Sequence, residues 1–117
     1  MITVYCYDKC STCQRALRWL EERGVEYEKF DIKTQHPSEK VLRKLHKVSG
    51  LSLRSFFNTS GLLYREMKLS EKLPAMSDDE QFSLLATDGM LLKRPLFVSN
   101  KVVIPGFKEV AWQEAVE

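Results

Sequence analysis

Long hydrophobic runs are absent from this sequence. No apolar stretch approaches the roughly 18 residues that a membrane-spanning helix needs. Residues 1–7 also lack the basic start and the longer apolar segment of a secretory signal. Repeats, linkers and low-complexity segments are missing from the 117 residues, a length that suits one domain. We therefore expect a single cytoplasmic domain with no membrane partner.

An excess of charge of either sign is missing too. The 18 lysine and arginine residues and the 16 aspartate and glutamate residues are interspersed and leave a net charge of +2. Proteins that bind nucleic acid directly gather basic residues into a patch or stripe, which this sequence does not show. With 44% hydrophobic and 29% charged residues, the composition is that of an ordinary globular domain. We expect no direct contact with nucleic acid.

Cysteines are few and odd in number, at positions 6, 10 and 13. In a reducing compartment this count argues against a framework of structural disulfides and leaves redox or metal chemistry. The spacing resembles the cluster motif of radical SAM enzymes, but Cys6 falls within a predicted strand and not on a loop with the other thiols. A zinc site would need a fourth ligand from His36, expected in a loop, or His46, expected on a helix surface. We expect no bound metal.

The segment Cys10-Ser11-Thr12-Cys13 stands at a junction between a predicted strand and a predicted helix. Residues 2–7 alternate and are largely β-branched or aromatic, which favours a strand. Residues 14–23 have the pattern of an amphipathic helix that stops at Gly24. The first N–H groups of a helix lack partners and carry partial positive charge, so they favour a thiolate over a thiol. In such settings the pKa of a thiol falls from about 8.5 to roughly 3.5–7.5.

Cys10 is therefore the candidate nucleophile. Cys13, one turn further on and on the same side of the helix, is placed to attack a mixed disulfide formed on Cys10. The alternative is that both residues are small buried hydrophobic groups, because free cysteine is often buried. If Cys10 is the nucleophile and Cys13 the resolving thiol, the pair is a catalyst or a redox switch.

A second strand and a series of helices follow. Residues 25–32 predict a strand, so that strand, helix and strand form a right-handed parallel crossover. Ser38 is the expected N-cap of a helix that ends at Gly50. Residues 64–68 predict a short helix, and Ser77 begins a capping-box sequence ahead of a helix that ends at Asp88-Gly89. The residues of the first of these helices that we expect to face the core are Val41, Leu42, Leu45 and Val48.

The C-terminal part predicts a β-hairpin and a closing helix. Residues 96–98 and 102–104 are rich in β-forming residues and flank an Asn-containing turn, and Pro105-Gly106 ends the second strand. Residues 108–116 have the pattern of an amphipathic helix. Its expected inward positions are Val110, Ala111, Trp112 and Ala115.

This order of elements resembles the thioredoxin fold. The motifs Cys10-Ser11-Thr12-Cys13, Lys93-Arg94-Pro95 and Gly106-Phe107 resemble those of the arsenate reductase (ArsC) and Spx family over essentially the whole chain. The resemblance implies an α/β, thioredoxin-like fold with a small mixed sheet flanked by helices. It further implies a core at about residues 1–35 and 90–117 with an all-helical insertion at about 36–89. It also implies a cis peptide bond before Pro95, with this proline facing the active cysteine.

The resemblance implies a role for each motif residue. Arg94 would stabilise the Cys10 thiolate or hold an oxyanion beside it, and Pro95, Ser11 and Thr12 would contact the substrate. Without the resemblance, Arg94 is interpreted as a surface arginine next to a proline that starts a strand.

Two departures from the family patterns bear on the activity. Enterobacterial arsenate reductases hold their oxyanion with three arginines, of which Arg94 has a match here, while the other two positions fall at Asn58 and near Gly106-Phe107. An oxyanion would therefore meet fewer cations. In Spx-type regulators the insertion contacts the RNA polymerase α subunit, and a basic pair of that region is replaced here by Ser60 and Leu62.

The expected function is that of a cytosolic thiol–disulfide oxidoreductase or ArsC-like reductase. Cys10 attacks, Cys13 resolves and Arg94 stabilises the anion. No cofactor is bound, and thioredoxin or glutathione supplies the electrons. The alternative is an Spx-type redox-sensing transcriptional regulator that binds the RNA polymerase α subunit.

Overall fold

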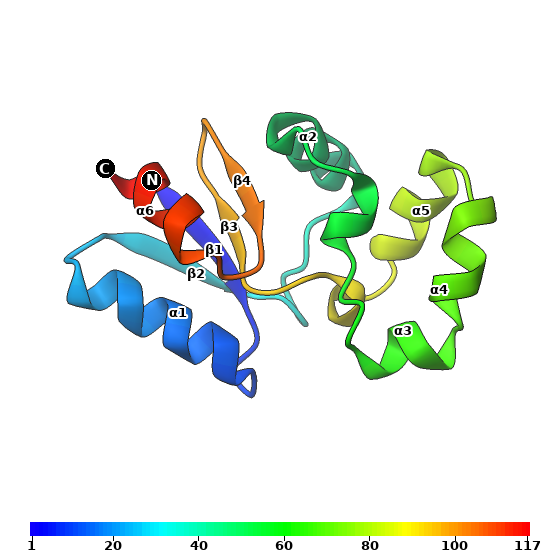
Figure 1. Cartoon of the computed structure of the whole chain (residues 1–117), viewed down its shortest axis with the longest axis horizontal. Coiled ribbons are helices and arrows are strands. Elements are labelled where there is room, and N and C mark those ends of the chain that lie inside the picture. Colours follow the sequence, from blue (N-terminus) through cyan, green and yellow to red (C-terminus); the bar gives the residue numbers. More distant parts are fainter.

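A computed structural model describes all 117 residues and contains a four-stranded mixed sheet in the order β2-β1-β3-β4. The strands are β1 (Ile2–Cys6), β2 (Tyr27–Asp31), β3 (Leu96–Val98) and β4 (Val103–Pro105). β1 and β2 are parallel and are joined through helix α1 (Ser11–Glu22), whereas β3 pairs antiparallel with β1 and with β4. The predicted mixed sheet with a parallel crossover and a hairpin is confirmed (Figure 1).

Helical turns make up the long connection between β2 and β3. In chain order they are α2 (Glu39–Ser49), η1 (Leu53–Phe56), α3 (Leu62–Glu66), α4 (Leu69–Lys72), η2 (Leu73–Ala75), α5 (Asp78–Leu85) and η3 (Gly89–Leu91). Helix α6 (Glu109–Val116) follows β4. The predicted N-caps are present, because the Ser38 hydroxyl accepts a bond from the Val41 amide and Ser77 forms a capping box with Glu80. None of these helices combines the length and the apolar composition of a membrane-spanning segment.

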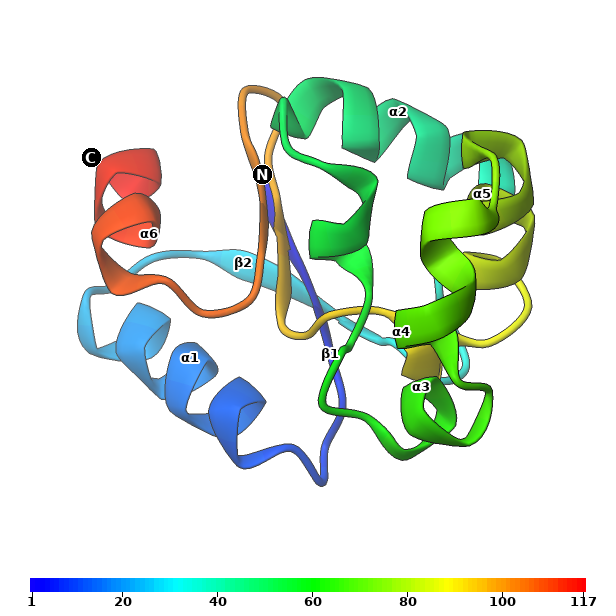
Figure 2. The ribbon, with the colours of Figure 1, turned by 45° about the vertical axis from the view of Figure 1, so that its right-hand side comes forward.

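The sheet is buried on both faces. Successive residues of a strand point to opposite faces, and in β1 Val4 and Cys6 join one hydrophobic cluster while Tyr5 joins the other. The first cluster includes residues of α1 and α6, and the second includes residues of α2, α5 and the short helices near them. Figures 1 and 2 show these two groups of helices on opposite sides of the sheet. The CxxC segment therefore lies at one end of the sheet, on the side of α1.

Helix α2 is rotated relative to the prediction. Val41 and Val48 are expected in the core, but each side chain is 39% exposed. The buried residues of this helix are Leu42 and Leu45. A helix of this length buries a narrow stripe when it covers only one edge of a core, so its flanking valines remain at the boundary with solvent.

In α6 the prediction of an inward Val110 is wrong, since this side chain is 76% exposed. Trp112 fills the space below the helix and is completely buried. In α1, Trp19 also belongs to the core, at a position that the sequence pattern did not single out.

Several predicted boundaries are wrong by a few residues. α1 begins at Ser11, so three residues of the CxxC segment already belong to the helix. β2 is shorter than residues 25–32, and α5 ends at Leu85, before Asp88-Gly89. The helix expected at 64–68 spans residues 62–66 instead. β4 spans residues 103–105 where 102–104 is predicted, so it ends at Pro105 and includes it; proline is tolerated there because β4 is an edge strand.

Candidate active site

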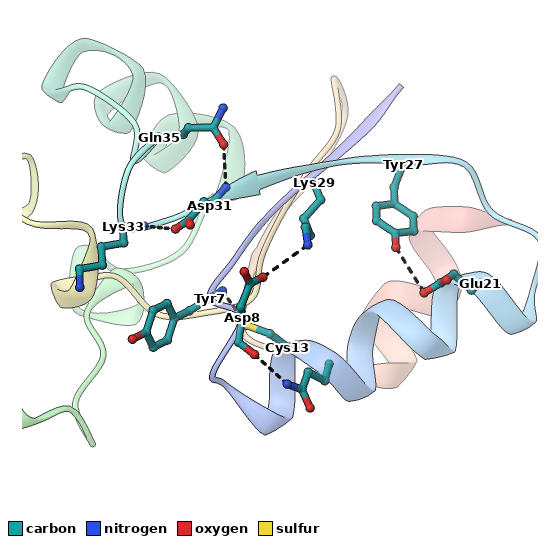
Figure 3. A network of polar contacts seen from close by, with 10 residues as sticks. Tyr7, Asp8, Cys13, Glu21, Tyr27, Lys29, Asp31, Lys33 and Gln35 are labelled. Atoms are coloured by element: carbon teal, nitrogen blue, oxygen red, sulfur yellow. Dashed lines mark hydrogen bonds and ion pairs between the residues drawn. The ribbon is translucent and has the colours of Figure 1, made fainter.

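Cys10 is the N-cap residue of α1. Its amide donates to the carbonyl of Tyr7 at 2.9 Å, and its carbonyl accepts the first helical bond from Gln14 at 3.1 Å. The Gln14 side chain donates to the carbonyl of Asp8 at 2.7 Å, and the Asp8 carboxylate pairs with Lys29 of β2 at 3.4 Å (Figure 3). These contacts hold the turn between strand and helix from both sides, so Cys10 stands at the helix N-terminus as predicted.

The two cysteines of the motif differ in access. The Cys10 side chain is partly exposed, whereas Cys13 is only 1% exposed. Both are free thiols. A substrate can therefore reach Cys10 first, and Cys13 can act only on an atom that is brought to it inside the protein. The interpretation of both residues as buried hydrophobic groups does not fit Cys10.

The sulfur of Cys13 receives hydrogen bonds from its surroundings. The amide of Tyr7 donates to it at 3.5 Å (Figure 3), and the thiols of Cys6 and Cys10 lie beside it. The bond from Cys6, aided by the Tyr7 amide, the Cys10 thiol and the charge of Arg94, lowers the pKa of Cys13 to about 6 despite its burial. Donating this bond, together with burial, raises the pKa of Cys6.

This arrangement differs from the expected one in which helix amides stabilise Cys10. The sulfur of an N-cap residue can accept a bond from the first turn, but the Cys10 side chain makes no capping hydrogen bond. The amide that reaches a sulfur comes instead from Tyr7, ahead of the turn, and it reaches Cys13.

Arg94 and Pro95 are joined by a cis peptide bond, as the family resemblance implies. The Arg94 guanidinium lies 5.3 Å from the centre of the Tyr7 ring, and its Nη1 donates to the carbonyl of Met90 at 3.4 Å. Its Nε is buried and has no hydrogen-bond partner. The carbonyl of Pro95, itself buried, accepts a bond from Gly106 at 2.8 Å. Arg94 is therefore a fixed, partly buried cation beside the cysteines and not a free surface side chain.

Cys10 and Arg94 open into one pocket of about 410 Å³. Of the other predicted substrate-binding residues, Thr12 lines this pocket, whereas Ser11 is exposed and neither it nor Pro95 is part of the lining. The lining also includes Asn58, Gly106 and Phe107, which the family resemblance places at or near two arginine positions. Its remaining residues, which were not predicted as site residues, are Ser60, Lys93 and Lys108. Lys93 stands next to Arg94 in the sequence, and this basic pair before a hairpin is the one local signal that points to it.

Two backbone hydrogen bonds bring the insertion to this pocket. The amide of Asn58 donates to the carbonyl of Leu91 at 2.7 Å, and the amide of Lys93 donates to the carbonyl of Phe56 at 2.8 Å. They flank an isolated antiparallel bridge between Phe57 and Leu92. Asn58 and Lys93 thus face the same pocket although they are distant in the sequence.

Gly106 and Phe107 form a rigid wall. Gly106 has a φ of 85°, a left-handed conformation that favours glycine, and a Cβ there would lie 3.1 Å from Cε of Lys93. The Trp112 indole donates to the Gly106 carbonyl at 3.0 Å. The Phe107 ring packs edge-on against Trp112 and Trp19, with centroids 4.9 and 5.8 Å apart. Buried rings of α1 and α6 therefore fix the apolar side of the pocket.

The two histidines lie elsewhere. His36 is in a loop, as predicted, and its Nε2 donates to the carbonyl of Ala86 at 3.0 Å. His46, expected on the surface, is half-buried and stacks edge-on against Phe56 and Phe82. The structure gathers no group of three or more His, Cys, Asp or Glu side chains that could hold a metal ion. The chemistry available at the pocket is that of thiols and cations.

Comparison with known proteins places this geometry in a family. The ArsC family model matches residues 5–115. The Bacillus subtilis protein YusI is 52% identical over 113 residues, which are 97% of this chain and 96% of YusI. The crystal structure of an ArsC family related protein from Bacteroides fragilis has a TM-score of 0.94 and 45% identity, and covers 97% of this chain and 95% of that one. The global transcriptional regulator Spx of Staphylococcus aureus is 23% identical over 109 residues, 93% of this chain and 82% of Spx. The predicted thioredoxin-like fold and the predicted ArsC and Spx relationship are confirmed.

Proposed function

The chain belongs to the ArsC family, and from this premise we propose that it is a cytosolic thiol–disulfide oxidoreductase. The observation that carries the proposal is the pairing of an accessible sulfur with a buried one: Cys10 is partly exposed at the start of α1, and Cys13 lies one turn below it with a lowered pKa. A thiolate is the nucleophilic form of cysteine, and a lower pKa increases its fraction at neutral pH. The pair therefore has an entry sulfur and a resolving sulfur.

The reaction that we propose has two exchange steps. The Cys10 thiolate attacks one sulfur of a disulfide R–S–S–R, forms a Cys10–S–S–R mixed disulfide and displaces R–S⁻. The Cys13 thiolate then attacks the Cys10 sulfur, forms the Cys10–Cys13 disulfide and displaces the second R–S⁻. The two protein thiols supply the two electrons and the two protons that the leaving thiolates take up. Thioredoxin or glutathione then reduces the protein disulfide, so no bound cofactor is required.

Arg94 assists by charge and position. Its guanidinium is held by Tyr7 and by the Met90 carbonyl, and its charge lowers the pKa of the neighbouring Cys13. In the proposed reaction it also stabilises the Cys10 thiolate or an anionic group of the substrate. Thr12 contacts the substrate from the wall of the pocket, whereas Ser11 and Pro95, which do not line it, act through the neighbours Cys10 and Arg94 that they adjoin in the chain.

Arsenate is a less favoured substrate for this pocket. Asn58 and Gly106, at or near the positions of two arginines of the enterobacterial enzymes, do line the pocket but carry no charge. Arg94 is then the one guanidinium of the pocket, and its other cations are Lys93 and Lys108. A lysine ammonium lacks the planar fork with which a guanidinium binds an oxyanion through two hydrogen bonds.

The proposal is tested with the reduced protein and the neutral bis(2-hydroxyethyl) disulfide. We expect the wild type to turn over with thioredoxin or glutathione as reductant. Cys10→Ser should be inactive, and Cys13→Ser should stop at a mixed disulfide that mass spectrometry detects on Cys10. Circular dichroism of both variants checks that the fold is retained. Undiminished turnover by Cys10→Ser, or no oxidation of the wild type, would refute the proposal.

A second candidate function is that of a redox-switched regulator that binds the RNA polymerase α subunit. The relationship to Spx favours it. In this case the Cys10–Cys13 disulfide changes an interface and no substrate is turned over. Capture of the α subunit by the oxidised but not the reduced protein, without turnover of any disulfide, would favour the regulator over the enzyme.

A further inference from the structure

A second hollow adjoins the pocket of Cys10. Its volume is about 340 Å³, and Lys93 and Lys108 line both hollows. Arg94 belongs to the first and Arg54 to the second. Neither hollow is lined by an aspartate or a glutamate. We call the joined hollows, with Arg54, Lys93, Arg94 and Lys108, the basic groove.

The charges of the basic groove are not neutralised within the protein. The ion pairs of the chain join Lys29 to Asp8 and Arg43 to both Glu39 and Asp79. None of the four groove cations takes part in one. The basic groove therefore presents uncompensated positive charge along a path that begins at Cys10, and such a concavity concentrates anions.

Neutral donors accompany these cations. The second hollow includes the hydroxyls of Ser52, Ser55 and Thr59, and the first includes the Ser60 hydroxyl and the Asn58 amide. Hydroxyls and amides can donate to carboxylate oxygens that lysines hold electrostatically. The lining is suited to an extended organic anion.

We infer that the substrate of Cys10 is a low-molecular-weight disulfide whose carboxylate groups bind along the basic groove, an inference that rests on the proposed function. The row of cations extends from the pocket of Cys10, which is bordered by Lys93, Arg94 and Lys108, to Arg54 in the second hollow, and this length suits an extended organic anion better than a compact inorganic oxyanion. Each hollow has the size of a site for a small molecule. Lys93 and Lys108, which border both, are the specificity-determining residues.

The charge of such a substrate affects the first exchange step. A carboxylate near the scissile disulfide repels the Cys10 thiolate, and a lysine between them offsets this repulsion. Cys10 then bonds to the nearer sulfur, one carboxylate-bearing thiolate leaves, and Cys13 displaces the second. The products are two carboxylate-bearing thiols and the Cys10–Cys13 disulfide, with electrons and protons balanced as above.

The test compares three short disulfides that differ in charge. These are 3,3′-dithiodipropionate, which is anionic, bis(2-hydroxyethyl) disulfide, which is neutral, and cystamine, which is cationic. The reduced protein is mixed with each, and the loss of free thiols is followed in a single turnover. Each rate is divided by that of 2-mercaptoethanol, a thiol with no charged substituent, with the same disulfide, which removes intrinsic reactivity. We expect the normalised rate for the anion to exceed that for the cation by roughly tenfold or more, and about 0.5 M salt to reduce the difference.

Substitutions test which residues cause the preference for the anionic disulfide. Lys93→Gln and Lys108→Gln should each lower the anionic-to-neutral rate ratio by roughly threefold. Lys101→Gln, an exposed lysine in the turn between β3 and β4, is the matched control and should leave the ratio unchanged. Arg54→Gln should slow reaction with the longer glutathione disulfide more than reaction with 3,3′-dithiodipropionate.

The outcomes separate the inference from the proposed function. Equal normalised rates for the three disulfides, or a ratio that Lys93→Gln and Lys108→Gln leave unaltered, would overturn the inference while the oxidoreductase function stands. A wild type that none of the disulfides oxidises would overturn both.

Discussion

The thiols of Cys6 and Cys13 hold their protons differently in the folded and the unfolded chain. Unfolded, both titrate near the ordinary thiol pKa of about 8.5. Folded, the hydrogen bond from Cys6 lowers the pKa of Cys13 to about 6, and donation of that bond raises the pKa of Cys6. A group with a depressed pKa stabilises the fold above its unfolded pKa, and this contribution is lost as the pH falls through its folded pKa.

We expect this linkage to appear as a pH-dependent difference in stability between the wild type and Cys13→Ala. The difference should rise by on the order of 1–3 kcal/mol between pH about 6 and pH about 8.5. Above about pH 8.5 it should fall again, because the raised pKa of Cys6 lowers the stability of the wild type, whereas in Cys13→Ala the Cys6 thiol has lost its bond to Cys13 and its pKa is raised mainly by burial. Urea unfolding of the reduced proteins across this range measures the difference.

Ser11→Ala is the control for this measurement, because Ser11 lies in the same turn but is exposed. Its difference from the wild type should not change with pH. If the difference in free energy of unfolding between the wild type and Cys13→Ala also did not change with pH, the fold would not favour the Cys13 thiolate.

At the level of single residues, the sequence predicted the site residues that belong to local motifs. Cys10 and Thr12 follow the first strand directly, so pattern alone placed them at one end of the sheet, whereas Arg94 was placed beside them by its match to the family motif. Lys108 was not predicted, because its place in the pocket depends on how separate segments meet, and Asn58 was placed only by its alignment with an arginine of the family. The amide that reaches Cys13 was missed for a related reason, since it comes from Tyr7 in an irregular turn.

At the level of elements, η3 packs closely against the end of β2. A Cβ added to Gly89 would overlap the carbonyl oxygen of Ile32 and crowd the side chain of His36. Ile32 itself is completely buried, so this backbone has little freedom to move. Gly89 therefore lets the end of the insertion approach the sheet just before the segment that carries Arg94.

Gly89→Ala should be strongly destabilising, by about 3 kcal/mol or more, because the overlap is with backbone and not with a flexible side chain. Gly50→Ala is the matched control. Gly50 has a φ of 67° and open space around its Cβ position, so its substitution costs only the left-handed strain, roughly 1 kcal/mol. Thermal or urea unfolding of the two variants compares them. If both variants lost the same free energy of unfolding, the backbone around Gly89 and Ile32 would be able to move and accommodate the added methyl group.

The elements that the sequence predicted well carry strong local signals. The capping box at Ser77 and the left-handed Gly50 marked helix ends correctly, because capping depends on neighbours in the chain. α4 and its separation from α3 were missed. Lys68, between them, has a φ of 53° although it is not a glycine, so the sequence contains no residue that predicts the end of α3 there. The inclusion of Pro105 in β4 depended on which strand lies at the edge, and this is a property of the whole sheet.

For the whole molecule, the central strands connect the two hydrophobic clusters. Val4 and Tyr5 are adjacent in β1 but belong to opposite clusters, and the same holds for Leu96 and Phe97 in β3. Loss of packing on either face therefore removes support from strands that build the other. The bridge between Phe57 and Leu92 adds a direct backbone connection from the insertion to the segment that enters β3. We expect the insertion and the sheet to unfold together.

The two tryptophans allow a test of this cooperativity. Trp19 and Trp112 both belong to the cluster formed with α1 and α6, so their fluorescence reports on that face alone. Leu85, in α5, is completely buried in the other cluster. Leu85→Ala should lower the free energy of unfolding by about 2–5 kcal/mol, and the fluorescence midpoint and the far-ultraviolet circular dichroism midpoint should shift together. Leu62→Ala, on the same insertion but with a side chain that is 65% exposed, should change either midpoint little. A circular dichroism midpoint that shifts while the fluorescence midpoint stays in place would mean that the insertion unfolds independently, and that the basic groove, which includes Arg54 of the insertion, is formed between two units and not within one.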